Sequence, residues 1–131
     1  MEEKKKRYWG IGSTHDKKPV VNDFINKGIA CVGWDEKQAG TLHEILKHHI
    51  KKDDIIFIKS YSPSNGLYIK AVGIVNDVEY RDRGNGKVVG VKWHWTGKQK
   101  LGIVRDKYNV RSITLFEEFN PDIIQFLNSK L

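Results

Sequence analysis

The chain has 131 residues, which fits a single domain, 1–131, whose core needs neither disulfides nor a structural metal. It carries 23 Lys and Arg against 16 Asp and Glu, and the formal net charge of +7 suits a polyanionic partner such as nucleic acid. No apolar stretch approaches the roughly 20 residues of a membrane span, and the one cysteine excludes a disulfide within the chain. We therefore expect a cytoplasmic protein whose residues 1–7 form a basic N-terminal arm.

The first third of the sequence predicts a strand, a helix and a second strand. Residues 8–13 read as the first strand. Pro19 marks a helix start, apolar residues then recur on one helical face, and Gly28 is a natural stop. Residues 28–33 are an apolar run bounded by glycines, which is typical of a buried strand, and Trp34 follows where the chain leaves the sheet. Binding sites tend to be built at such strand ends.

The middle of the chain predicts a second helix and then a series of strands. A stripe with the spacing i, i+3, i+4, i+7 and i+8 starts at Leu42 and indicates a helix over residues 41–50. Residues 55–60 are almost wholly apolar, which predicts a central strand. Residues 67–75 and 87–95 are further strands, separated by polar turns.

The last third completes the predicted fold. Strict alternation in the strand 87–95 places Trp93 and Trp95 on the same face. Residues 101–116 form a less regular strand region, and a closing helix begins with Asn120 as its N-cap and a proline at its first position. The elements together predict one α+β domain, with a curled, antiparallel-rich sheet or barrel flanked by helices on its outside.

The residue types most often used in catalysis lack the spacing that catalysis needs. Three histidines, His43, His48 and His49, lie on one predicted helix but contain no i, i+4 pair that would converge on a metal ion. Cys31 lies in a predicted buried strand, and no serine sits in a nucleophile-elbow motif. We therefore expect no catalytic residue, no metal and no cofactor.

Aromatic side chains on a basic chain are the more informative feature. A base stacked on one such ring contributes about 1–3 kcal/mol to binding. Packing in the core is the alternative role, and it is favoured for the three tryptophans inside predicted strands. A binding role is favoured for the two rings at predicted strand ends, which glycine or polar residues flank. The candidates are Trp34 and Tyr61 at strand ends, and Trp9, Trp93 and Trp95 within strands.

Taken in order, several segments resemble the PUA-like superfamily, especially its EVE and YTH members and the similar modified-base-reading domains of bacterial restriction systems. The likeness spans residues 8–95 and includes the turn before the central strand, where the family's usual Gly-Asp is replaced by Asp53 and Asp54. The matching segments are residues 8–13, 21–25, 28–34, 52–61, 67–75 and 89–93.

The resemblance implies a barrel-like sheet with a pocket for a nucleobase, often modified and flipped out of its stack. Carried over to this chain, Trp34 would be a stacking wall and Tyr61 a second wall or lid. Ser13 and Ser60 would be polar contacts, and Lys59 would meet a phosphate. The expected function is a nucleic-acid-binding module for DNA or RNA that carries, in some ligands, a modified base, and it is not an enzyme.

Two other function classes stay open on the sequence. One is a base- or RNA-processing enzyme that uses His15, Asp16 or Asp35 near the pocket. The other is a protein- or small-ligand-binding module of a defence system. Salt dependence separates this last class from a nucleic-acid binder, because binding to a polyanion weakens as the salt concentration rises.

Overall fold

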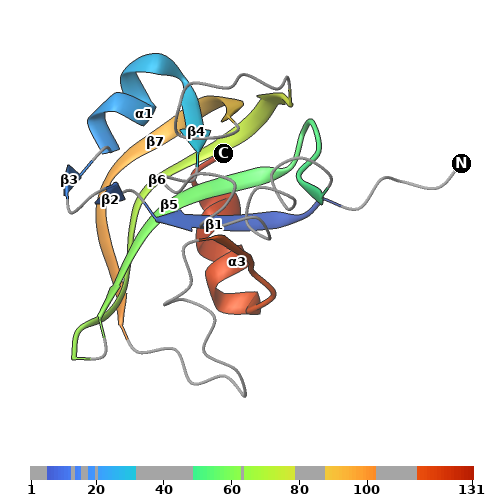
Figure 1. Cartoon of the computed structure of the whole chain (residues 1–131). Helices are drawn as coiled ribbons and strands as arrows, with labels where there is room; N and C mark the ends of the chain where they lie inside the picture. Colours follow the sequence, from blue (N-terminus) through green and yellow to red (C-terminus); the bar gives the residue numbers. More distant parts are fainter. Residues whose placement is uncertain are drawn as a thin grey trace, which may run out of the picture.

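The structure, a computed structural model shown in Figure 1, contains one mixed sheet of six strands. The strand order is β4 (Ile29–Cys31), β7 (Val88–Gly102), β6 (Gly66–Asp77), β5 (Ile55–Ser62), β1 (Tyr8–Gly12) and β8 (Leu115–Glu117). Two further short strands, β2 (Thr14–His15) and β3 (Lys18–Pro19), pair with each other. The described residues are 6–12, 14–15, 18–19, 21–31, 49–62, 64–78, 88–102 and 115–131.

The first strand and the central strand run in parallel. β1 pairs with β5 from Tyr8 opposite Ile55 to Gly12 opposite Lys59. The other four pairings of the six-stranded sheet are antiparallel, so the antiparallel-rich sheet predicted from the sequence is confirmed. Because β1 and β5 are parallel, both deliver their carboxyl ends to the same edge of the sheet.

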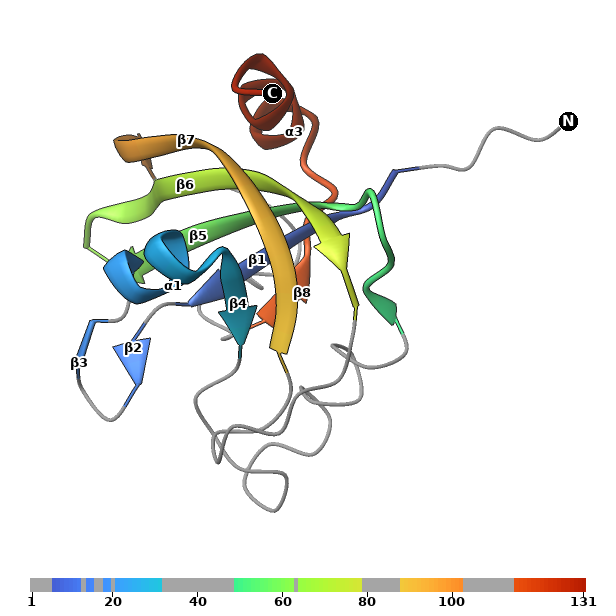
Figure 2. The same cartoon turned by 90° about the horizontal axis from the view of Figure 1, so that it is seen from above.

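Residues from both margins of the sheet share one buried cluster. Ala30 of β4 and Leu115 of β8 lie at opposite ends of the strand order, yet both belong to the cluster that contains Ile58 of β5. The sheet therefore curls toward this side into a half-barrel (Figures 1 and 2). Phe24 of α1 (Val21–Lys27) also belongs to this cluster, and we call this side of the sheet the inner face.

The helix α3 (Pro121–Ser129) packs on the opposite side, which we call the outer face. Ile123 and Leu127 of α3 join Ile55 and Phe57 of β5 in a second buried cluster. Figure 2 shows α1 and α3 on opposite sides of the sheet. The predicted curled sheet with helices is thus confirmed, but the prediction that the helices lie on its outside is wrong for α1, which packs against the inner face.

The helix ends predicted from local sequence signals agree with the structure, with one exception. The side chain of Asn120 accepts hydrogen bonds from the backbone N–H groups of Asp122 and Ile123 at 2.9 and 3.3 Å, which confirms the predicted N-cap. Gly28 ends α1 with a φ of 63°, as predicted. The predicted helix start at Pro19 is wrong, because Pro19 pairs with Thr14 in a short hairpin and α1 begins after it.

The two tryptophans of β7 point to opposite faces, which corrects the prediction that they share one. Val72 of β6 pairs with Trp95, and the next residue, Gly73, pairs with Trp93. One residue of β7, His94, is therefore an extra residue in a β-bulge, and it reverses the alternation of the side chains. As a result Trp93 packs against the inner cluster and Trp95 against the outer one.

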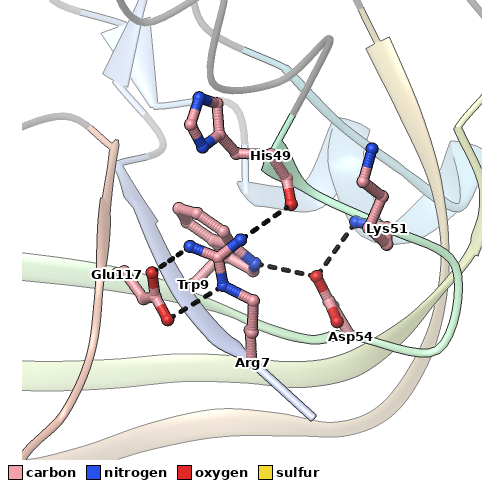
Figure 3. Close-up of polar contacts among 6 residues, drawn as sticks. All are labelled: Arg7, Trp9, His49, Lys51, Asp54 and Glu117. Carbon is pink, nitrogen blue, oxygen red and sulfur yellow. Dashed lines mark hydrogen bonds and ion pairs between the residues drawn. The ribbon is translucent and has the colours of Figure 1, made fainter. Parts of the chain in front are cut away.

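A polar network ties together the amino ends of β1 and β5 (Figure 3). The guanidinium group of Arg7 forms an ion pair with Glu117 and lies 4.7 Å from the centre of the Trp9 ring. The indole N–H of Trp9 donates to Asp54 at 3.0 Å, and the backbone N–H of Lys51 donates to the same carboxylate oxygen at 2.9 Å. Arg7, expected in a basic arm, is thus engaged in the fold.

The left-handed backbone conformation in the turn before β5 can be tested by substitution. Asp53 has a φ of 76°, a left-handed conformation that disfavours most side chains by about 1–2 kcal/mol. We expect Asp53→Val to lower the free energy of unfolding in urea by that amount, and Asp53→Gly to leave it within about 1 kcal/mol of the parent value. Lys52→Val is the matched control in the same turn. Equal losses for Asp53→Gly and Asp53→Val would contradict the interpretation.

Candidate nucleic-acid interface

Three predicted contacts at the carboxyl end of β5 do not lie on one surface. Tyr61 packs against the outer cluster, and the Lys59 ammonium lies 5.7 Å from the centre of the Phe116 ring, which is part of that cluster. Ser60 lies between them and therefore faces the inner side. It pairs directly with Tyr68 of β6. Of the three, the structure brings only Ser60 to the inner face.

Two of the predicted aromatic contacts are packed within the inner face. The Trp9 side chain is 3% exposed, and Asp54 accepts its indole N–H. The Trp93 indole donates to the backbone carbonyl of Phe24 at 3.0 Å and so fastens α1 to β7. Both rings have a structural role in this fold, in line with the packing alternative.

Other sequence-predicted residues fall outside the part of the chain that the structure describes. These are Ser13 and Trp34 among the predicted base contacts, and Asp16 and Asp35 of the enzyme alternative. The predicted helix over residues 41–50 lies outside the described residues except for its last two positions. The backbone of His15 is described in β2, but its side chain is not.

A tyrosine with two lysines occupies the end of the inner face next to Ser60. Tyr68 lies between Leu67 and Ile69, which both belong to the outer cluster, so its ring faces the inner side. The ammonium groups of Lys98 and Lys100 lie 5.0 and 6.0 Å from the centre of that ring. Tyr68 is half-buried and both lysines are exposed. We call the set Ser60, Tyr68, Lys98 and Lys100 the Tyr68 patch.

The Tyr68 patch lies where the two parallel strands end. Gly12, the last residue of β1, pairs with Lys59, which directly precedes Ser60. In open α/β sheets, ligands commonly bind outside the carboxyl ends of the parallel strands, although here only the pair β1 and β5 is parallel. The patch lies at the same end of this one parallel pair.

The two described segments that form the patch contain basic residues and no acidic ones. Residues 59–75 and 88–102 contain five lysines and no aspartate or glutamate. The acidic residues of the described part of the chain are Asp23, Asp53, Asp54, Asp77, Glu117, Glu118 and Asp122, which all lie in other segments. An excess of one sign of charge within these segments favours anionic ligands.

The sequence analysis missed Tyr68, Lys98 and Lys100. The strand predicted over residues 87–95 ends before both of these lysines. In the structure a Cβ atom on Gly97 would lie 2.8 Å from Cζ2 of Trp95, so glycine is required for close packing of that ring and β7 continues to Gly102. An alternating Lys-x-Lys after the glycine is the signal that could have revealed the patch.

Lys59 is a buried cation on the outer face. Its side chain is 6% exposed, and burial lowers the pKa of its ammonium group to about 8. The amine lies close to the Phe116 ring. At neutral pH the fold therefore carries a charge that has lost most of its hydration.

This burial predicts how stability depends on pH. Between pH 8 and 10.5 the unfolded state keeps the Lys59 proton that the folded state has lost, so stability rises with pH in that window. We expect Lys59→Met to raise the free energy of unfolding at pH 7 by on the order of 3 kcal/mol and to remove most of this rise. Urea denaturation at several pH values measures both effects, and Lys52→Met, at an exposed lysine, is the control. Parallel pH profiles for Lys59→Met and the parent would contradict the assignment.

Comparisons with known proteins do not identify the chain. No protein-family model and no curated protein sequence matches it.

The two helices of the described part have 7 and 9 residues, and neither approaches the about 20 residues that cross a bilayer. Within the same part, no three His, Cys, Asp or Glu side chains lie together as metal ligands would. The geometry of the Tyr68 patch is therefore the main basis for a functional proposal.

Proposed function

We propose that the protein is a nucleic-acid-binding module of the PUA-like kind and that the Tyr68 patch contacts the ligand. The observation that carries this proposal is the placement of two exposed ammonium groups within 5.0 and 6.0 Å of one half-buried tyrosine ring. Nucleic acid presents a flat base and an anionic phosphate on each nucleotide. The patch offers a partner for both groups.

Each part of the patch has a defined task in this proposal. The Tyr68 ring stacks on a base, which contributes about 1–3 kcal/mol whatever the base is. Lys98 and Lys100 neutralise phosphates, and the hydroxyl of Ser60 hydrogen-bonds to a base edge. Ser13 and Trp34 remain proposed contacts for a flipped and, in some ligands, modified base, as the resemblance to PUA-like domains implies. DNA and RNA both have the required chemistry, and binding needs no catalytic group.

Lysines on an exposed strand have another common role, which is to prevent pairing with other chains. That role requires charge along the edge of the strand. It does not require two ammonium groups to converge on one aromatic ring, nor a hydroxyl as the ring's cross-strand neighbour. This convergence supports a ligand site over simple protection of the edge.

Charge-removing variants test the phosphate contacts. We expect the double variant Lys98→Gln and Lys100→Gln to reduce the slope of log affinity against log salt by about 0.7–0.9 for each lost contact. Fluorescence anisotropy with a labelled oligonucleotide at several salt concentrations measures this slope. The exposed Lys52→Gln, at the other end of β5, is the control and keeps the parent slope. An affinity that does not change with salt would overturn the proposed function.

Ring-removing variants test the stacking contact separately. We expect Tyr68→Leu to weaken binding by about 1–3 kcal/mol and to leave the salt slope unchanged, because a ring contacts bases and not phosphates. Tyr68→Phe keeps the ring and should bind as the parent does. Thermal unfolding of both variants checks that each is folded at the temperature of the assay. Equal affinity for Tyr68→Leu and Tyr68→Phe would exclude stacking on this ring.

A further inference from the structure

A second set of aromatic and basic side chains lies on the outer face, close to the Tyr68 patch along β7. The rings of Trp95 and Phe126 meet edge to face, with 5.7 Å between their centres and an angle of 89°. The ammonium group of Lys130 lies 5.3 Å from the centre of each ring. All three side chains are half-buried, so each keeps some surface in contact with solvent. We call them the Trp95 cluster.

We propose that the ligand is single-stranded nucleic acid and that it crosses the edge of β7 to reach both the Tyr68 patch and the Trp95 cluster. This inference rests on the proposed function and adds the ligand class and a second contact site. The bulge at His94 is what makes the arrangement possible, because it turns Trp95 to the outer face while Lys98 and Lys100 remain beside Tyr68 on the inner face.

Where the nucleic-acid strand would cross it, the edge of β7 has no β-strand partner among the described residues. β4 pairs only with Val88–Gly90 of β7, and one further hydrogen bond joins the N–H of Val91 to the carbonyl of Gly28. Beyond Val91, no strand among the described residues pairs with that side of β7. Trp95 and Lys98 are three residues apart, which is roughly 10 Å along a strand. A few nucleotides therefore suffice to join the two contact sites.

A ligand that crosses the edge of β7 to contact both faces has to be flexible. A protein layer one sheet thick is roughly 10 Å across. Duplex DNA has a persistence length of about 50 nm, so it cannot fold around an edge of that thickness. A single strand can turn over the edge, with one base on each aromatic site. The same geometry therefore excludes simultaneous contact of a duplex with both faces.

The charge at the Trp95 cluster agrees with an anionic ligand. Lys130 makes no ion pair with any residue in the described part of the chain. Lys130 is the C-cap of α3, and the only charged residue within the helix, Asp122, lies in its first turn at the far end. Lys130 is thus placed to meet a phosphate next to a stacked base.

Two oligothymidylates and one duplex test the inference. A strand of about 16 nucleotides, the upper end of the usual range of single-strand sites, can reach both contact sites, whereas a dinucleotide is too short to place one base on each and contacts the Tyr68 patch alone. We expect the parent protein to bind the longer single strand at least about tenfold more tightly than a duplex of the same length. Trp95→Leu should weaken binding of the longer strand by about 5- to 150-fold, which corresponds to the 1–3 kcal/mol of one stacked base.

The variant Lys130→Gln tests the second site without depending on whether Trp95→Leu folds. It should reduce the salt slope for the longer strand by about 0.7 and leave the shorter strand unaffected. Lys52→Gln is the control. If Lys130→Gln and Trp95→Leu bind the longer strand as the parent does, while Tyr68→Leu still weakens it, the second site is excluded and the proposed function stands. If the parent binds neither oligothymidylates nor duplex, both proposals are overturned.

Discussion

The fold depends on one buried carboxylate, that of Asp54. It is 4% exposed and accepts hydrogen bonds from the Trp9 indole and the backbone of Lys51, which come from different parts of the chain. A buried carboxylate without such partners costs several kcal/mol, so the network strongly favours one arrangement of β1 against β5. Because these strands are parallel, a register set at their amino ends also holds at their carboxyl ends. It is this register that places Gly12 beside Lys59 and fixes the edge at which Ser60 and Tyr68 meet.

Features of the fold with a local cause could be predicted from the sequence. The cap at Asn120 and the stop at Gly28 depend on a few neighbouring residues, and the apolar run after Asp54 is buried because it forms the centre of the sheet. The bulge at His94 has no such local signal. It arises where Gly73 of β6 lets β7 approach closely: a Cβ atom on Gly73 would lie 2.6 Å from the backbone oxygen of Lys92. Its cause thus lies in a different strand.

The candidate site was harder to predict than the fold. The resemblance to PUA-like domains implied that Lys59, Ser60 and Tyr61 all contact one ligand, but consecutive residues of a strand face opposite sides. Pairing of strands that are distant in sequence decides which residues share a surface. Tyr68 and Lys100 are 32 positions apart and become cross-strand partners only when β6 and β7 pair. The composition did indicate a basic surface, but it could not locate the lysines on it.

Among the described residues, charge is distributed unevenly between the two ends of the parallel strands β1 and β5. At the amino ends of β1 and β5, the acidic groups Asp54 and Glu117 lie among basic ones, and Glu117 neutralises Arg7. At the carboxyl ends, Lys98 and Lys100 have no acidic residue within their own segment or in the facing part of β6. If the protein binds a polyanion as proposed, the charges of the described residues would favour its approach to the Tyr68 patch, and this attraction would act before any base is stacked. Long-range charge would thus determine where the ligand lands, and the aromatic rings on the two faces of β7 would determine how it is held.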